Sequence, residues 1–228
     1  MKHIDEILPA TVENRRVWAH IDLDALAHNY IVSRDYIQSQ NPGTPTVAVI
    51  KADAYGHGIG PCARALYQAG CRHFAVACVE EGIAIRYALA DLARERAEIL
   101  ILGYTSPAHA ELLHRFDMTQ TLYSPDYASE LHAAAKAAGI KLNVHVKIDT
   151  GMHRIGYPAF TPEDAEATAD AICAMQDTCD AFCVQGLFTH LSDADSGNFC
   201  YEQWQRYLAV KKELEARGKC PPVCHACN

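Results

Sequence analysis

The feature that most constrains the fold is a regular alternation of short, β-branched segments with longer segments of helical periodicity. Turn residues mark nearly every change between the two. We expect strands over the ranges Val17–Leu23, Thr46–Lys51, Phe74–Cys78, Ile99–Leu102, Thr119–Tyr123, Leu142–Asp149, Cys183–His190 and Val223–Asn228. Eight strands alternating with helices over this length favour an α/β fold of the (β/α)₈ TIM type, which takes about 250 residues. A doubly wound open sheet is the alternative.

The expected helices have recognisable ends. A hydroxyl side chain followed by proline, which suits the start of a helix, occurs at Ser106-Pro107, Ser124-Pro125 and Thr161-Pro162. Glycines suited to the end of a helix stand at Gly70, Gly139 and Gly218. The last helix is expected over about Tyr201 to Arg217.

The composition describes a globular chain with one large core, because half of its 228 residues are hydrophobic and 21% are charged. The net charge of -8 argues against a partner that is nucleic acid or an anionic membrane. No apolar stretch approaches the ~20 residues of a membrane span, and residues 1–16 lack a signal-peptide core. We therefore expect a cytoplasmic protein with an N-terminal arm over 1–16 and a single barrel domain over 17–228.

The ten cysteines are scattered through a chain without an export signal, so we expect free thiols. The tail from Cys220 to Cys227 imitates a zinc cluster, but structural zinc sites usually pair two separated ligand turns. We interpret this tail as a barrel strand and expect no metal site.

A lysine ends one of the apolar strands. Lys51 follows Thr46–Ile50 and precedes a loop that contains Tyr55, Gly56, His57 and Gly58. A lysine beside an apolar wall has its ammonium form destabilised, which makes the free amine available as a nucleophile or Schiff-base former. The plain alternative is a lysine that only reaches from the core to solvent. The two glycines favour the first interpretation, because they let the backbone approach a ligand closely.

A second strand carries three ionisable residues on one face. Strand periodicity over Leu142–Asp149 places His145, Lys147 and Asp149 together, opposite Val144, Val146 and Ile148. Both faces of a barrel strand are covered, so these charges need partners. Arg154 follows on the same rim and is suited to pairing with an oxyanion. A structural ion-pair network is the alternative.

A third strand ends on His190. A single histidine at a strand end is more often a structural residue than a catalyst. We consider His190 a candidate site residue because of the other two strand ends, since the carboxyl ends of all three strands would lie together at one end of a barrel.

Together these segments resemble alanine racemase, a pyridoxal-phosphate enzyme. The resemblance lies in Trp18–Ala25, Val49–Gly58, Val79–Gly82, Lys147–Gly156, Gly186–His190 and His225–Asn228. It runs from about Arg16 to the end of the chain. The lysine segment and the Asp-Thr-Gly-Met segment are specific when they occur together.

The resemblance implies a role for each site residue. Lys51 would hold pyridoxal 5'-phosphate as an aldimine and act as the base for the D-enantiomer, and Tyr55 would reach the phosphate. Lys147 would be carbamylated, and this anion would hold Arg154 against the cofactor phenolate and the substrate carboxylate. His190 and Asn228 would line the cofactor ring. The reaction would be an isomerase reaction, the interconversion of L- and D-alanine, which supplies D-alanine for peptidoglycan precursors.

The chain also departs from that family, because it stops at Asn228. The resemblance implies a further barrel strand, a C-terminal β-domain that carries the base for the L-enantiomer, and a homodimer of the full-length protein. It also assigns Val17–Leu23 to that second domain, which leaves seven strands in a barrel that is incomplete at its last strand. We therefore expect this chain alone to be inactive or weakly active.

Two other functions remain open from the sequence. A serine racemase of the same family would carry out the same reaction on serine in place of alanine. A non-catalytic pyridoxal-phosphate carrier would fit the length better, but it would leave the segment Lys147–Gly156 without a counterpart.

Overall fold

The structure of the protein is a computed structural model, and it describes residues 17–92, 95–161, 163–195 and 197–226. The strands are β1 Val47–Val49, β2 His73–Val76, β3 Glu98–Ile101, β4 Thr119–Leu122, β5 Leu142–Asp149, β6 Tyr157–Pro158, β7 Phe182–Thr189 and β8 Val223–His225. The helices are α2 Leu23–Gln40, α3 Lys51–Tyr55, α4 Ile59–Gln68, α5 Val79–Ala88, η2 Pro107–His109, α6 Ala110–Arg115, α7 Pro125–Ala137, α8 Asp164–Thr178 and α9 Asn198–Ala216.

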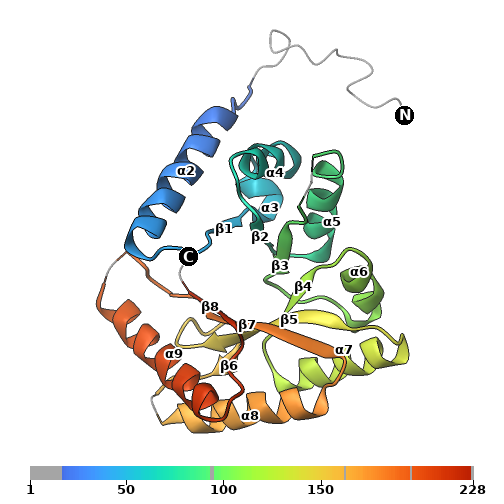
Figure 1. Ribbon diagram of the computed structural model, residues 1–228, viewed down its shortest axis with the longest axis vertical. Helices are drawn as coiled ribbons and strands as arrows, with labels where there is room; N and C mark the ends of the chain where they lie inside the picture. Colours follow the sequence, from blue (N-terminus) through green and yellow to red (C-terminus); the bar gives the residue numbers. More distant parts are fainter. Residues whose placement is uncertain (1–16, 93–94, 162, 196, 227–228) are drawn as a thin grey trace.

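The strands form one parallel sheet that curls into an arc, with the helices on its outer side (Figure 1). Seven strands follow the order β1-β2-β3-β4-β5-β7-β8, and the short β6 pairs with β5. Within the described ranges, no ladder joins β8 back to β1. The expected α/β barrel, incomplete at its last strand, is therefore confirmed, and so is the count of seven barrel strands.

The strand expected over Val17–Leu23 is wrong. These residues form no strand, and α2 begins at Leu23. The Asp22 carboxylate caps the helix by accepting the backbone N–H of Ala25 at 2.9 Å. The cap fixes the start of the helix. Within the described ranges, no strand pairs with the residues that precede it, so they have no ladder to join. Strand β6 was not predicted, because its two residues leave no periodic signal in the sequence.

Most of the predicted helix ends match the structure. Ser124 caps α7 by accepting the backbone N–H of Tyr127 at 3.2 Å. The three glycines expected at helix ends all have positive φ: Gly70 at 99°, Gly139 at 65° and Gly218 at 66°. Ser106 precedes η2 without a side-chain capping bond. Pro162 lies outside the described residues.

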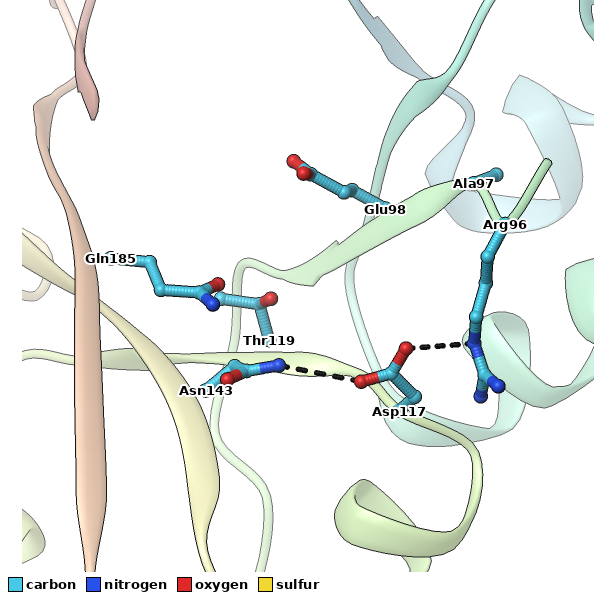
Figure 2. Close-up of a pocket in the computed structure, with 7 residues that line it drawn as sticks. All are labelled: Arg96, Ala97, Glu98, Asp117, Thr119, Asn143 and Gln185. Carbon is cyan, nitrogen blue, oxygen red and sulfur yellow. Dashed lines mark hydrogen bonds and ion pairs between the residues drawn. The ribbon is translucent and has the colours of Figure 1, made fainter. Parts of the chain in front are cut away.

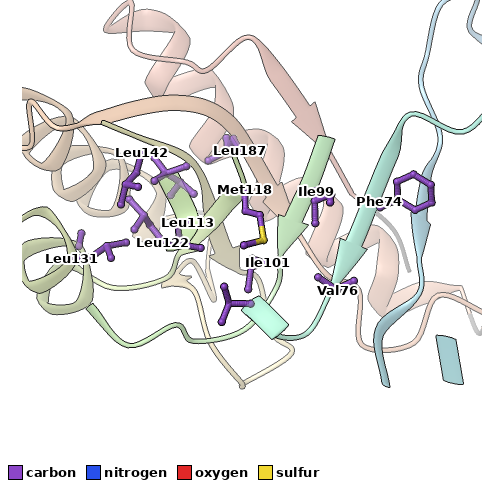
Figure 3. Close-up of a cluster of buried hydrophobic side chains, with 14 of the residues drawn as sticks. Phe74, Val76, Ile99, Ile101, Leu113, Met118, Leu122, Leu131, Leu142 and Leu187 are labelled. Atoms are coloured by element: carbon purple, nitrogen blue, oxygen red, sulfur yellow. The ribbon is translucent and has the colours of Figure 1, made fainter. Parts of the chain in front are cut away.

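The main core lies between the outer face of the sheet and the helices (Figure 3). Val144, Val146 and Ile148 of β5 belong to it and are fully buried. The predicted alternation of β5 is therefore confirmed, because Lys147 and Asp149 must occupy the opposite, concave face. A smaller apolar cluster on that face is built from Ala75, Leu100 and Phe188 with partly buried neighbours.

In the part of the chain that the structure describes, no helix is both long and apolar enough to cross a bilayer.

Candidate active site

The candidate site lies at the carboxyl ends of β1, β5 and β7, where the sequence analysis placed its strand-end residues. Lys51 begins α3 directly after β1, and Ile50 before it is buried. The lysine itself is half-buried. The carboxyl ends of parallel strands meet at one edge of the sheet, so this lysine shares its edge with the segments that follow β5 and β7.

An unusual turn fixes the backbone after Lys51. Residues Ala52, Asp53, Ala54 and Tyr55 have φ between 51° and 55°, the left-handed helical region. For residues with a Cβ, this conformation costs about 1–2 kcal/mol each. The turn ends at Gly56, which is also left-handed and whose N–H donates to carbonyl oxygens of the turn.

Two carboxylates hold this turn in place. The Asp53 carboxylate accepts the backbone N–H of Ile59 at 2.7 Å, which joins the turn to α4. Glu81 of α5 accepts the N–H of Ala77 at 2.8 Å with one oxygen and that of Asp53 at 3.4 Å with the other. These supporting roles of Asp53 and Glu81 were not predicted from the sequence, although both residues lie in segments that carry the family resemblance.

The loop after β5 is organised by Asp149. Its carboxylate accepts the backbone N–H groups of Gly151 and His153 at 3.0 Å and of Arg154 at 3.2 Å. Gly156 then passes so close that a Cβ there would lie 2.5 Å from the backbone nitrogen of Asp149. Asp149 is therefore a positioning residue that folds the loop so that Arg154 returns toward Lys147.

The charges of the candidate site act on one another. Burial lowers the pKa of Lys147 to about 8, with a further contribution from Arg154 and a smaller one from Lys51, while Asp149 opposes the shift. Burial also lowers the pKa of His190 to about 4, with contributions from the same three cations. The structure thus brings together four of the predicted residues, Lys51, Lys147, Arg154 and His190.

These cations have no close counter-ion within the described ranges. No carboxylate there lies within ion-pair distance of Lys51, Lys147 or Arg154. The nearby Asp149 carboxylate is instead engaged by backbone N–H groups. A cluster of cations at the edge of a sheet, without an anion of its own, is suited to binding an anionic ligand.

The structure does not place the other two predicted residues, Tyr55 and Asn228, within this cluster of charges. Tyr55 ends the left-handed turn and is 60% exposed, so its ring is free to contact a ligand from the rim. Asn228 lies outside the described residues, and the structure gives it no position. Among the residues described, no group of three or more histidine, cysteine or acidic side chains is arranged to hold a metal ion.

A buried hydrogen-bond network joins the site loops to α9. The hydroxyl groups of Thr150 and Thr189 lie 2.9 Å apart, and Gln203 of α9 reaches Thr150 at 3.4 Å. The Gln203 amide oxygen also accepts the backbone N–H of Ser192 at 2.9 Å, in the loop after His190. A fully buried glutamine on a helix gave no signal in the sequence, because its role depends on contacts with residues far away in the chain.

A cavity lies at the opposite edge of the sheet (Figure 2). Its volume is about 260 Å³, and its lining comes from residues at or just before the starts of β3, β4 and β5, together with Gln185 of β7. Here Arg96 pairs with Asp117 at 2.7 Å, and the Asn143 amide donates to the same carboxylate at 3.3 Å. Because these charges are already neutralised, this cavity is a weaker candidate for a catalytic site.

Known proteins match both the sequence and the fold of this chain. The family model "Alanine racemase, N-terminal domain" matches residues 21–228. An alanine racemase of Desulfovibrio desulfuricans is 38% identical over 217 residues, which cover 94% of this chain and 54% of that protein. One from Clostridium perfringens is 38% identical over 216 residues, covering 94% of this chain and 52% of the relative.

Solved structures give the same result. The alanine racemase of Clostridium difficile 630 in complex with cycloserine superposes with a TM-score of 0.78 at 32% identity. The match covers 93% of this chain and 55% of that one. The chain therefore spans about half the length of the relatives it matches.

Proposed function

Because this chain belongs to the alanine racemase family, we propose that it forms the cofactor-binding barrel of a pyridoxal-phosphate-dependent racemase, an isomerase that interconverts L- and D-alanine. The observation that carries the proposal is the cluster of Lys51, Lys147 and Arg154 at one edge of the sheet, without a close carboxylate within the described ranges. In this proposal, residues 17–228 are the barrel domain and residues 1–16 are an arm that precedes it.

The site fits pyridoxal 5'-phosphate by its charge and its donors. The cofactor is anionic, and the cations of the site lack an anion of their own among the described residues. Lys51 is half-buried at a strand end, and the turn behind it fixes its backbone. When bound, the cofactor supplies the electron sink that stabilises a carbanion at the α-carbon of an amino acid.

Each residue of the site would have a separate role in the reaction. Lys51 would hold the cofactor covalently through Nζ and move the α-proton on the face of the D-enantiomer. Tyr55 would contact the phosphate, and Arg154 would orient the substrate carboxylate by a charge-assisted hydrogen bond. His190 and Asn228 would lie along the cofactor ring. The low pKa of His190, about 4, supports this role, because the ring would stay neutral beside the cations.

Lys147 would be modified by carbon dioxide. A carbamate forms when a neutral amine attacks carbon dioxide, so that an N–C bond forms and a proton leaves. The pKa of Lys147 is lowered to about 8, which supplies more neutral amine near neutral pH than an ordinary lysine does. The resulting anion would replace repulsion between Lys147 and Arg154 by a charge-assisted pair.

Membership of the family also supports a proposal about the assembly, location and metabolic role of the full-length protein. The full-length protein would act as a homodimer in the cytoplasm and supply D-alanine for peptidoglycan precursors. Racemisation needs a base on each face of the α-carbon, so the base for the L-enantiomer would come from elsewhere in that assembly.

The test begins with cofactor attachment. After incubation with pyridoxal phosphate and reduction with borohydride, peptide mapping should find the label on Lys51. A label spread over several lysines, or one on Lys141 at the opposite edge of the sheet, would contradict the site. The full-length protein should then racemise alanine faster than serine, whereas the 228-residue chain should show little turnover. Faster turnover of serine would change the substrate and leave the site intact.

The carbamate has its own measurement. Protein equilibrated with ¹³C-bicarbonate should show a carbamate carbon resonance that is lost in Lys147→Gln and retained in Lys141→Gln. A wild-type protein without the resonance would contradict the modification.

A further inference from the structure

Two cysteines near the end of the chain lie side by side, and the proposed racemase chemistry does not use them. The sulfur atoms of Cys220 and Cys224 are 3.8 Å apart. Cys220 stands in the turn that leaves α9, and Cys224 lies in β8, where it is opposite Leu187 of β7. The nine cysteines that the structure describes are free, and these two are the pair it places in contact.

The local chain keeps the two sulfurs together. Both thiols lie 3.7 Å from the carbonyl oxygen of Pro221, so one acceptor holds them on the same side of the turn. The residues between them include Pro221 and Pro222, whose fixed φ angles reduce the freedom of the turn. The backbone of β8 is held by its ladder with β7. The pair is therefore held at short range in the reduced protein.

The two thiols differ in accessibility. Cys224 is exposed, whereas Cys220 is half-buried. Burial and the neighbouring Cys224 raise the pKa of Cys220 to about 11, so Cys220 stays protonated near neutral pH. A reagent from solvent would therefore meet Cys224 first, and Cys220 would be the thiol within reach for a second step.

We propose that Cys220 and Cys224 form a dithiol site that exchanges with small disulfides, such as oxidised glutathione, and closes to an intramolecular disulfide. The Cys224 thiolate attacks the small disulfide, forms a mixed disulfide and releases one small thiolate. Cys220 then attacks the Cys224 sulfur, its proton passes to the departing sulfur, and the second small thiol leaves. Both cysteines are oxidised by two electrons in total, and the small disulfide is reduced to two thiols.

Formation of this disulfide would affect strand β8. His225 follows Cys224 in this strand, bonds to His145 at 3.0 Å and stacks on Phe188 with ring centroids 4.8 Å apart. Closing the ring from Cys220 to Cys224 would tie the turn to this strand. Oxidation would therefore restrain the last described strand of the sheet without touching Lys51.

The test uses glutathione buffers of increasing oxidised fraction, followed by acid quenching, alkylation of free thiols and peptide mapping. We compare the ratio of reduced to oxidised glutathione at which each product is half-formed. For the Cys220–Cys224 link this ratio should be at least about tenfold higher than for the glutathione adduct of Cys183, because ring closure is intramolecular. Cys183 is the matched control, since it is exposed and the structure gives it no partner sulfur among the described residues.

Variants separate the two steps. In Cys220→Ser, the link should vanish and Cys224 should accumulate as a stable glutathione adduct, while Cys183→Ser should leave the link unchanged. Circular dichroism checks that each variant is folded. A wild-type protein that keeps a glutathione adduct on Cys224 beside a free Cys220, or that links Cys224 to Cys227, would overturn the proposal.

Discussion

The two edges of the sheet differ in whether their cationic side chains have ion-pair partners. At the carboxyl edge, burial and the nearby Arg154 and Lys51 lower the pKa of Lys147, and none of these three cations has a close carboxylate within the described ranges. At the amino edge, Arg96 is paired with Asp117. In the proposed function the carboxyl edge would be the one that binds an anionic ligand, because paired charges stabilise the fold locally, whereas unpaired cations keep their electrostatic potential for an anion from outside.

The first test of this difference removes an arginine from each edge of the sheet. Arg154→Ala should weaken the affinity for pyridoxal phosphate roughly 10- to 100-fold, because hydrogen bonds to charged groups contribute about 1.5–3 kcal/mol. Arg96→Ala should change it by less than about twofold, since its guanidinium is engaged at the other edge. Equilibrium titration of the cofactor measures both. Equal losses in the two variants would show that the edges do not differ in ligand binding.

The second prediction concerns stability. Lys147→Met should raise the free energy of unfolding by about 1–3 kcal/mol at neutral pH, because it replaces a buried charge by an apolar side chain of similar length. Denaturant unfolding in carbon-dioxide-free buffer measures this, since the buffer keeps the lysine unmodified. A loss of stability in the variant would show that the Lys147 ammonium has a stabilising partner.

The third prediction is the pH dependence of that gain. The pKa of Lys147 is about 8 in the folded chain and close to 10.5 when unperturbed, so the unfolded chain binds more protons between these values. The stability of the wild type relative to Lys147→Met should therefore rise with pH across this window. It should be lowest below pH 8, and its slope should not exceed about 1.4 kcal/mol per pH unit. A flat difference would contradict the shifted pKa.

The smallest effect is expected at the amino edge. Arg96→Met should lower the free energy of unfolding by no more than about 1 kcal/mol, because both partners of this ion pair are substantially exposed to solvent. The loss should shrink at high salt, which screens exposed charges. Unfolding at two salt concentrations tests the point. A loss of several kcal/mol would mean that this edge carries more of the stability than its exposure indicates.

The sequence was most informative where one pattern repeats along a strand. The bounds of β5 match the prediction, and its alternation correctly assigned Lys147 and Asp149 to the concave face. The prediction failed at Val17–Leu23, where the Asp22 cap starts a helix and, among the described residues, no strand pairs with the segment before it. A hydrophobic pattern describes a segment by itself and cannot show whether a partner strand lies beside it.

The sequence identified the charged residues that the structure brings together in the candidate site, but not the residues that support them. Lys51 and Arg154 are conspicuous because charged groups at strand ends are unusual in a buried sheet. Glu81 and Gln203 were missed because their partners come from distant parts of the chain. Asp149 was placed on the correct face, but its bonds to the backbone of the following loop were not predicted. The left-handed turn was missed for a similar reason, since alanine, aspartate and tyrosine give no local signal for positive φ.

That turn also determines when the site comes into existence. Its conformation is costly for an isolated peptide, and one of its clamps, the bond from Asp53 to Glu81, spans 28 residues. The unfolded chain therefore does not contain the turn, which becomes stable only after β2 and α5 have assembled beside it. In a collapsed but incompletely packed chain, Lys51 would be a lysine like any other. Its selectivity for a cofactor would thus be acquired late in folding, as a property of the finished sheet.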